Sequence, residues 1–254
     1  MVAVAEAAAD VAGAVIRPFF RNGVTAALKS DQSPVTIADR SAEAAIRAML
    51  RERFPADGIL GEEFGHERET ARRCWVLDPI DGTRAFLTGR PVFGTLIGLI
   101  EDGRPVLGII DQPITGERWV GAAGRETRFR GPFGGQPGCR PCARLDAAEL
   151  SCTSPDMFDA TDLTRFRRLA GAVRRVSWGG DCYGYGLLAL GQIDLIAEAD
   201  LKPWDWAPLA PIIEGAGGRL VGWDGTALHL GCDGRVLAAG DPALVADAVR
   251  LLAP

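Results

Sequence analysis

Residues 74–83 read CWVLDPIDGT, and this stretch holds most of the information about fold and chemistry. The apolar run over 74–77 is typical of a buried strand, and it leads into two aspartates three residues apart, Asp78 and Asp81. Pro79 fixes the backbone after Asp78 and removes a hydrogen-bond donor, so both carboxylates can turn inward where the strand ends. Hard carboxylate oxygens suit Mg²⁺, and we therefore expect a metal site there.

The two residues after the aspartates favour an anion beside the metal. Gly82 allows the backbone to approach a ligand closely. If a helix begins after it, the N–H groups of Gly82 and Thr83 point at the anion, and the helix dipole attracts it. Metal on one side and a helix N-terminus on the other predict a phosphate site. The alternative is that Asp78 and Asp81 are only turn and cap residues, because Asp is common in both roles.

Two further acidic motifs lie before and after this stretch. Residues 61–63 read GEE after an expected short strand, and by themselves Glu62 and Glu63 are typical of a solvated loop. Residues 204–208 read WDWAP, which places Asp205 between two tryptophans. An aspartate there can cap a helix on an apolar surface, and a capping carboxylate can still bind a metal.

Around these motifs, expected strands and helices alternate along the chain, which predicts the α/β class. We expect helices at 2–20, 36 or 39 to 53, 161–170, 184–190, 206–216 and 242–252. We expect strands at 58–60, 74–77, 93–100, 104–111, 117–121, 151–153, 173–178, 193–198, 218–223 and 235–239. The Gly-, Pro- and Arg-rich segment 130–141 is the best boundary candidate. It divides an N-terminal α+β part with the metal site, 1–140, from a C-terminal α/β part, 141–254.

Composition and charge exclude several classes of protein. The 254 residues are 47% hydrophobic and 24% charged, a balance typical of a globular protein with a sizeable core. The net charge of −5 has no block of like charge, which argues against a nucleic-acid partner. The apolar stretch 92–100 is too short to span a membrane, and residues 1–10 do not resemble a signal peptide. We therefore expect a cytoplasmic protein.

Cysteine and histidine offer no competing chemistry. The six cysteines are expected to be reduced thiols. Cys139 and Cys142 form a C-x-x-C pair, but a zinc site would need a second pair at similar spacing and the sequence has none. A surface loop is expected there, and the role of the pair stays open. His66 and His229 are in no recognisable triad, so a histidine or cysteine nucleophile is not expected.

In combination, the GEE, DPIDGT and WD motifs resemble the inositol monophosphatase family of Mg²⁺-dependent, lithium-sensitive phosphatases. All three occur in the family's order, and the resemblance covers nearly the whole chain, from the N-terminal helix to the glycines at 217 and 218. The resemblance implies a layered α-β-α-β-α sandwich. It also implies a small phosphorylated alcohol as substrate, two or three Mg²⁺ ions in each site, and a homodimer.

The resemblance assigns metal ligands residue by residue. Glu62, Asp78 and the carbonyl of Ile80 would hold one ion. Asp78, Asp81 and Asp205 would hold a second. A phosphate monoester dianion repels hydroxide and has a poor alkoxide leaving group. Two cations neutralise that charge, generate a water nucleophile near neutral pH and stabilise the leaving oxygen.

The resemblance also assigns residues that act on water and substrate. Thr83 would position the attacking water, paired with Asp39 from the segment 34–39, and Glu62 is counted with them as catalytic. Gly82, Thr83 and Arg84 would contact substrate at the phosphate end. Glu198, seven residues before Asp205, matches a family position that contacts substrate hydroxyls.

Two substrates compete, an inositol phosphate and histidinol phosphate. Residues 78–86, DPIDGTRAF, contain Arg84 where many inositol phosphatases have a small polar residue or Lys, and residues 108–113 read GIIDQP. Both stretches resemble the histidinol-phosphatase branch of the family. Asp181 stands where the inositol branch has a small residue, and with Glu198 it would make the substrate pocket acidic. Such a pocket suits the ammonium and imidazole of histidinol.

Other interpretations remain open. Asp181 could instead cap the expected helix 184–190. A regulatory metal-binding protein of this fold is possible, since fold does not fix function, although the complete set of acidic motifs favours an enzyme. A sugar bisphosphatase or nucleotide 3′-phosphatase would use the same metal core. With two lysines in the chain, only arginines could bind its second phosphate.

Overall fold

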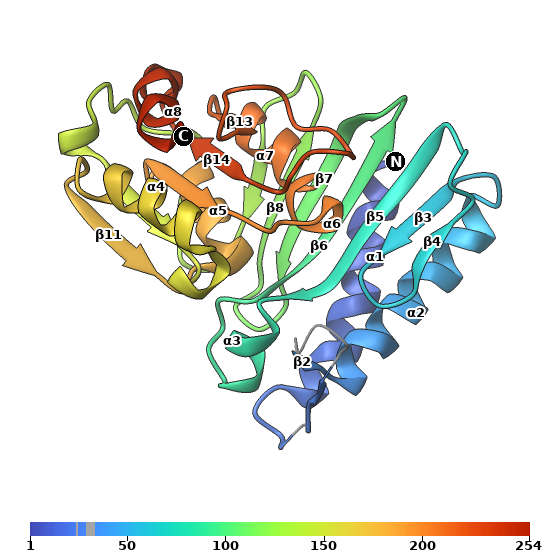
Figure 1. Ribbon diagram of the computed structural model, residues 1–254. Helices are drawn as coiled ribbons and strands as arrows, with labels where there is room; N and C mark the ends of the chain where they lie inside the picture. The colour runs from blue at the N-terminus through green and yellow to red at the C-terminus, as the bar shows by residue number, and fades with distance from the viewer. Residues whose placement is uncertain (24, 29–33) are drawn as a thin grey trace.

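The computed structural model describes residues 1–23, 25–28 and 34–254, and it contains two large β-sheets with helices between and outside them (Figure 1). The seven-stranded sheet has the order β4-β3-β5-β6-β7-β8-β9. Its strands are β3 (Gly58–Gly61), β4 (Gly65–Glu67), β5 (Arg73–Asp81), β6 (Gly94–Glu101), β7 (Arg104–Gln112), β8 (Glu117–Ala122) and β9 (Arg128–Arg130).

The five-stranded sheet has the order β11-β10-β12-β14-β13, and β10 runs parallel to both of its neighbours. Its strands are β10 (Glu149–Cys152), β11 (Arg175–Trp178), β12 (Leu195–Glu198), β13 (Arg219–Gly222) and β14 (Val236–Ala239). A short antiparallel pair, β1 (Ala27–Leu28) and β2 (Pro34–Val35), precedes the large sheets.

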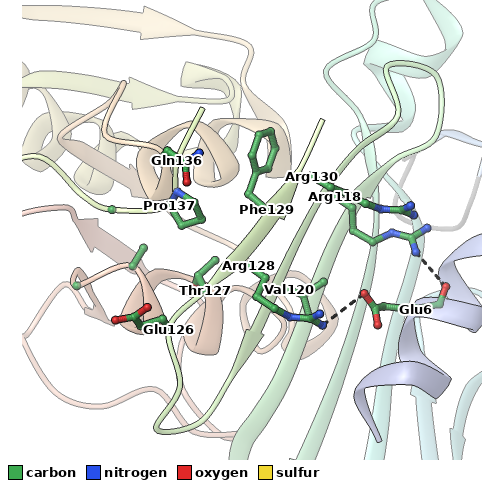
Figure 2. Close-up of a pocket in the computed structure, with 14 residues that line it drawn as sticks. Glu6, Arg118, Val120, Glu126, Thr127, Arg128, Phe129, Arg130, Gln136 and Pro137 are labelled. Atoms are coloured by element: carbon green, nitrogen blue, oxygen red, sulfur yellow. Dashed lines mark hydrogen bonds and ion pairs between the residues drawn. The ribbon is translucent and has the colours of Figure 1, made fainter. Parts of the chain in front are cut away.

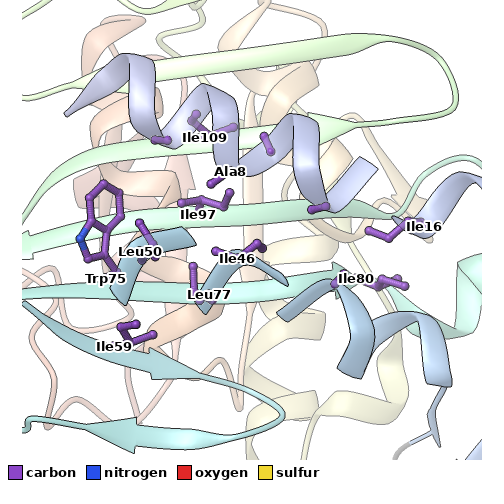
Figure 3. Close-up of a cluster of buried hydrophobic side chains, with 14 of the residues drawn as sticks. Ala8, Ile16, Ile46, Leu50, Ile59, Trp75, Leu77, Ile80, Ile97 and Ile109 are labelled. Atoms are coloured by element: carbon purple, nitrogen blue, oxygen red, sulfur yellow. The ribbon is translucent and has the colours of Figure 1, made fainter. Parts of the chain in front are cut away.

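Two helices cover one face of the seven-stranded sheet. The helix α1 (Val2–Ile16) contacts β6 and β7, and α2 (Ile37–Arg53) contacts β5 and α1. Figure 3 shows Ala8 of α1 and Ile46 of α2 in one buried cluster with Ile97 of β6 and Ile109 of β7. Small alanine side chains on α1 allow close packing of this layer, and four of them are fully buried: Ala5, Ala8, Ala9 and Ala12.

A second helical layer fills the space between the two sheets. It consists of α5 (Asp181–Ala189), α6 (Pro203–Trp206) and α7 (Leu209–Gly215). One buried cluster joins these helices to both sheets, since it includes Val76 and Leu96 from one and Ile196 and Val236 from the other. On the far side, α4 (Ala160–Ala170) packs against α8 (Val245–Leu252) over the five-stranded sheet. The layers therefore alternate α-β-α-β-α, as predicted.

Two glycines allow the middle helices to lie directly on the seven-stranded sheet. A Cβ at Gly108 would lie 1.7 Å from the carbonyl oxygen of Pro208, and one at Gly121 would lie 2.4 Å from the backbone nitrogen of Ile212. Any side chain at either position would therefore push α7 and the residues just before it away from the strands. The preceding helix α6 packs against β5.

Several predicted boundaries differ from the structure. The first helix ends at Ile16 rather than 20, because Pro18 has no N–H to continue the helical hydrogen bonds. The strand expected at 74–77 continues to Asp81. The helix expected at 206–216 is two helices, α6 and α7, and the short helix α3 (Thr83–Leu87) was not predicted. The short strands β1, β2, β4 and β9 were also missed.

The segment 130–141 connects the two large sheets, because β9 ends at Arg130 and β10 begins at Glu149. The division into 1–140 and 141–254 stays a prediction, since strands of both parts share the buried cluster described above. Among the helices in the described part of the chain, none combines the length and apolar character that crossing a membrane requires.

Candidate active site

Three carboxylates meet where β5 ends and α6 begins. Oxygen atoms of Asp78, Asp81 and Asp205 all lie within 4.8 Å of one another. In a regular strand, residues three apart face opposite sides, so Asp78 and Asp81 could not both point to this place. The register of β5 against β6 shifts between them, with Asp78 opposite Leu96 and Asp81 opposite Gly94. The extra residue on β5 is a β-bulge that turns both carboxylates toward the middle layer.

Asp205 reaches the cluster from the first turn of α6. Its Oδ2 accepts the backbone N–H of Lys202 at 2.7 Å, which stabilises the start of the helix. The alternative interpretation of Asp205 as the N-cap residue is wrong in position, because Lys202 is the N-cap and Asp205 is the third residue of α6. Its carboxylate nevertheless caps the helix by binding back to the N-cap backbone. The same carboxylate is also part of the three-carboxylate cluster, so the two roles coincide.

The cluster is electrostatically unfavourable without a cation. Burial, together with Glu62 and Asp81, raises the pKa of Asp78 well above its usual range. Burial and the neighbouring Asp205 raise the pKa of Asp81 to about 7. Burial likewise raises the pKa of Asp205 to about 7. Crowded, buried oxygen ligands of this kind match the donor set that Mg²⁺ prefers, and a bound cation would remove the repulsion.

Glu62 and Ile80 complete the predicted ligand set around Asp78. The Glu62 carboxylate lies close enough to hydrogen-bond Asp78 and contributes to raising its pKa. The backbone N–H of Ile80 donates to Asp78 Oδ1 at 3.0 Å, which orients that carboxylate. The Ile80 carbonyl accepts the Thr83 hydroxyl at 3.2 Å. Glu62 and Ile80 therefore lie next to Asp78, while their roles as metal ligands stay predictions.

The predicted pair of Thr83 and Asp39 is also brought together. Thr83 Oγ1 lies 3.5 Å from Asp39 Oδ1, although the two residues are 44 positions apart. Asp39 is fully buried in the first turn of α2, where its Oδ2 accepts the backbone N–H of Thr36 at 2.8 Å. One carboxylate oxygen therefore caps α2 while the other faces Thr83. Burial raises the pKa of Asp39.

Gly82 occupies a position that only glycine fills easily. Its φ of +86° is in the left-handed region, and a Cβ there would lie 2.8 Å from Cγ of Asp181. Gly82 precedes α3, which begins at Thr83, so the condition for the predicted anion site, a helix that begins after Gly82, is met. Arg84 follows in the first turn and is exposed.

A small acidic cavity of about 170 Å³ adjoins the carboxylate cluster. Asp81, Asp181, Glu198 and Asp205 contribute to its lining, so the predicted pair Asp181 and Glu198 shares one cavity with two predicted metal ligands. Burial, followed by the charges of Asp81 and Glu198, raises the pKa of Asp181 to about 7. The cavity would therefore favour a cationic group.

Asp181 does not cap a helix that starts at 184. The helix α5 begins at Asp181 itself, with Gly180 at the cap position. The N–H of Cys182 in its first turn is bound by Oδ2 of Asp81 at 2.6 Å. Asp181 has a φ of +45°, and its backbone N–H donates to the hydroxyl of Thr153 at 3.1 Å.

Two residues around Glu198 were missed in the sequence. Thr153 donates its backbone N–H to Glu198 Oε1 at 2.6 Å, and Tyr185 donates its hydroxyl to Oε2 at 2.9 Å. Both line the acidic cavity and fix the Glu198 carboxylate. Thr153 could have been anticipated, because it follows β10, and β10 and β12 are parallel neighbours whose carboxyl ends meet at one edge.

Residues 108–113 make contacts outside the acidic cavity. Asp111 pairs with the buried Arg118, which also binds Asp10 of α1 at 2.7 Å. The Gln112 side chain accepts the backbone N–H groups of Ile114 and Thr115 and so closes the turn after β7. In this structure Asp111 and Gln112 therefore serve packing and turn formation and do not line the acidic cavity.

A larger cavity, about 760 Å³, lies apart from the predicted site (Figure 2). It is bordered by α1, β8 and β9, and its arginines are engaged with acidic partners. Arg128 pairs with Glu6 at 3.4 Å, and Arg118 donates to the Glu6 carbonyl at 3.2 Å. None of the predicted site residues lines this cavity. The size of this cavity is therefore no evidence of a catalytic site. The small acidic cavity, in contrast, adjoins the carboxylate cluster.

The cysteines carry no metal site within the described part of the chain. All six are free thiols, and the one cluster of potential metal ligands found there is Asp78, Asp81 and Asp205. The loop with Cys139 and Cys142 is tied down by its backbone. Cys139 N–H donates to the Ala216 carbonyl, and Cys142 N–H donates to Asp241.

Comparison with known proteins gives a consistent set of relatives. The sequence profile described as "Inositol monophosphatase family" matches residues 1–252. The "Bifunctional phosphatase IMPL2, chloroplastic" of Arabidopsis thaliana is 47% identical over 225 residues, 88% of this chain and 64% of that protein. The chain thus spans less than two thirds of that relative's length.

Two further relatives match over most of their length. A histidinol-phosphatase of Mycobacterium tuberculosis is 41% identical over 207 residues, 78% of each protein. A solved structure described as an inositol monophosphatase from Zymomonas mobilis is 50% identical, with a TM-score of 0.90 and coverage of 99% of this chain and 96% of that chain.

Proposed function

The chain belongs to the inositol monophosphatase family of metal-dependent phosphomonoesterases, and on that premise we propose that it hydrolyses histidinol phosphate to histidinol and inorganic phosphate. The observation that carries the proposal is the small acidic cavity, in which Asp181 and Glu198 lie beside the carboxylate cluster. A substrate with a phosphate at one end and an ammonium and imidazole at the other matches this arrangement.

In this proposal, Mg²⁺ is held by Glu62, Asp78, Asp81, Asp205 and the carbonyl of Ile80, with two or three ions in each site. The burial and mutual repulsion of the three aspartates support this assignment. When bound, the ions neutralise the phosphate dianion and generate a water nucleophile near neutral pH. Glu62 and the three aspartates would fix where the ions bind and therefore where the water is activated.

Thr83 and Asp39 orient the attacking water. The Thr83 hydroxyl can donate to Asp39 Oδ1 or to the Ile80 carbonyl, which leaves its lone pairs to accept a water proton. Asp39 is held rigidly by the start of α2, so the hydroxyl has a fixed direction. The backbone at Gly82 and Thr83 and the exposed guanidinium of Arg84 would contact the phosphate.

Asp181 and Glu198 bind the cationic end of the substrate. Glu198 is held by Thr153 and Tyr185, so its carboxylate is already oriented before the substrate arrives. Asp181 is held from its backbone by Thr153, and its carboxylate lies against Gly82. Histidinol would therefore bridge two carboxylates while its phosphate lies at the metal end of the cavity.

A second candidate is hydrolysis of inositol 1-phosphate. It is favoured by the 50% identity to the Zymomonas mobilis protein, which is described as an inositol monophosphatase. Against it, a polyol gains less than a cation from two carboxylates. A regulatory protein without activity is a third candidate, and any Mg²⁺-dependent phosphate release would exclude it.

The test is phosphate release from histidinol phosphate, inositol 1-phosphate and a sugar bisphosphate, measured in parallel with Mg²⁺. We expect the highest kcat/KM with histidinol phosphate. Preference for inositol 1-phosphate would overturn the substrate assignment and leave the phosphatase assignment intact. A protein that binds Mg²⁺ and releases phosphate from none of the three would favour the regulatory role.

We also propose a cytoplasmic homodimer that acts without nucleic acid or membrane. The support is the acidic composition and the default of the family. Light scattering of the purified protein tests the dimer directly, and a monomer at micromolar concentration would contradict it.

A further inference from the structure

A buried glutamate on α2 holds the turn that carries Glu62. Glu43 is fully buried, and its carboxylate accepts two consecutive backbone N–H groups, from Glu63 at 2.8 Å and Phe64 at 3.2 Å. On the other side, the backbone N–H of Glu62 donates to the Leu77 carbonyl at 3.1 Å. The backbone of the turn is thus fixed from Glu62 to Phe64.

Arg47 stabilises the buried charge of Glu43 and forms further hydrogen bonds with the residues that follow the turn. Its Nε donates to Glu43 Oε1 at 2.7 Å and its Nη1 to Glu67 Oε1 at 2.8 Å. Its Nη2 donates to the carbonyl of Gly65, where β4 begins. A carboxylate this deeply buried needs such a partner, because an unpaired buried charge is strongly destabilising.

The glycine of the GEE motif is explained by this contact. A Cβ at Gly61 would lie 2.0 Å from Glu43 Oε1 and 2.5 Å from its Cδ. Gly61 therefore leaves the space through which the Glu43 carboxylate reaches the turn. The GEE motif and Glu43, which lies 18 positions before Gly61, therefore form one structural unit.

We propose that Glu43 is a positioning residue that keeps the Glu62 carboxylate beside Asp78. This inference rests on the proposed role of Glu62 as a metal ligand. Glu62 and Asp78 are neighbouring carboxylates that repel each other when both are ionised, so a loose turn would let Glu62 move away. The hydrogen bonds from Glu43 oppose that movement and organise the ligand before Mg²⁺ binds.

The test is calorimetric titration of Mg²⁺ into metal-stripped protein without substrate. Glu43→Gln removes the charge and turns an amide donor toward an N–H group or Arg47. We expect Mg²⁺ to bind about 10-fold more weakly, at the lower end of the effect of removing support from a metal ligand. The kcat at saturating Mg²⁺ should recover, because excess metal restores the occupied site. Gly61→Ala displaces Glu43 from the turn and should weaken Mg²⁺ binding in the same direction.

Asp162→Asn is the matched control for the loss of a buried, paired carboxylate. Asp162 lies on α4 and binds Arg235 at 2.8 Å, in the outer helical layer. This variant should lower the melting temperature and leave Mg²⁺ affinity unchanged. Unchanged Mg²⁺ affinity in folded Glu43→Gln or, should that variant not fold, in Gly61→Ala overturns the inference.

Glu62→Gln separates failure of this inference from failure of the proposed function. If Glu62→Gln weakens Mg²⁺ binding and Glu43→Gln does not, Glu62 is a ligand and Glu43 does not position it. If Glu62→Gln itself leaves Mg²⁺ affinity unchanged, the metal-ligand role of Glu62 is wrong, and the inference falls with it.

Discussion

Asp81 Oδ2 accepts the backbone N–H of Cys182 at 2.6 Å, across 101 positions of sequence. Asp81 ends strand β5 of the seven-stranded sheet, and Cys182 lies in the first turn of α5, between the sheets. One carboxylate thus belongs to the three-carboxylate cluster and also binds the helix that carries Asp181. A direct hydrogen bond therefore links the proposed metal end of the site to the helix that forms its proposed substrate end.

Removing one cluster carboxylate should abolish activity and leave the protein folded. In Asp78→Asn, we expect kcat to fall by roughly three orders of magnitude or more, because a lost metal ligand removes Lewis-acid assistance worth several kcal/mol. The metal-free variant should melt no lower than metal-free wild type, since a buried repelling charge has been removed. Phosphate release and thermal melts measure both effects. Full activity in Asp78→Asn would contradict the metal assignment.

The stability of the metal-free protein should fall as pH rises from about 4 toward 7. The pKa of Asp81 is raised from 3.8 to about 7, and that of Asp205 likewise, so between these values the folded state holds more protons than the unfolded state. The free energy of unfolding then decreases with pH. Because Mg²⁺ holds these carboxylates ionised, the stabilisation by Mg²⁺ should be larger at pH 8 than at pH 5.

Melting temperatures with EDTA and with Mg²⁺, taken across this pH range, check the relationship. In Asp205→Asn, one of the two titrating groups is gone, so the pH dependence of the EDTA series should be shallower. A metal-free protein whose melting temperature rises from pH 5 to pH 8 would contradict the prediction.

The Thr83 hydroxyl should matter more in the transition state than in substrate binding. We expect Thr83→Ala to lower kcat by about 10²-fold or more with a smaller change in KM, since water orientation acts at the chemical step. Thr83→Ser keeps the hydroxyl and should retain most of the activity. Steady-state kinetics decide, and a near wild-type kcat in Thr83→Ala would exclude the role.

Asp39→Asn should resemble Thr83→Ala in kcat, but it carries a second effect. Both carboxylate oxygens of Asp39 accept hydrogen bonds, one of them from the backbone N–H of Thr36 at the start of α2. Replacing one oxygen with an amide donor should therefore destabilise the protein by about 1 kcal/mol. Assays must therefore be made well below the melting temperature. If both variants keep kcat, the water-orienting pair is wrong.

Asp181→Ala should discriminate between substrates. A charge-assisted hydrogen bond contributes about 1.5–3 kcal/mol, which corresponds to a loss of roughly 10- to 150-fold in kcat/KM on histidinol phosphate. On inositol 1-phosphate the loss should be small, because the carboxylate cluster is intact. Equal losses on both substrates would show that Asp181 acts structurally, through its place against Gly82.

Gly82→Ala tests that contact. The added Cβ would meet Asp181 Cγ at 2.8 Å, and the φ of +86° is unfavourable for alanine. We expect kcat/KM on inositol 1-phosphate to fall, and a part of this loss to be restored in Gly82→Ala with Asp181→Ala, because the steric conflict is relieved. Purely additive effects in this double-mutant cycle would contradict the coupling.

The sequence alone determined the features that depend on neighbouring residues. The apolar run before Asp78 predicted strand β5, and the alternation of expected strands and helices predicted the α/β class. The DPIDGT and WD motifs contain the three aspartates that the structure gathers into one cluster, and the GEE motif contains Glu62, which lies beside Asp78. These predictions hold because strand, turn and residue chemistry are local properties.

Only the tertiary structure decided which of these residues act together. The β-bulge that turns Asp81 toward Asp78 depends on pairing with β6. Asp205 lies 124 positions beyond Asp81 and reaches the cluster because α6 packs against β5. In the sequence, nothing distinguishes Glu43 from the other charged residues of its helix. Its contact with the backbone of Glu63 exists only because α2 packs against the turn after β3. Such contacts join segments far apart in the chain, and burial raises the pKa values of Asp78, Asp81 and Asp205. No local pattern of residues encodes that change, because it comes from the packing of the whole fold.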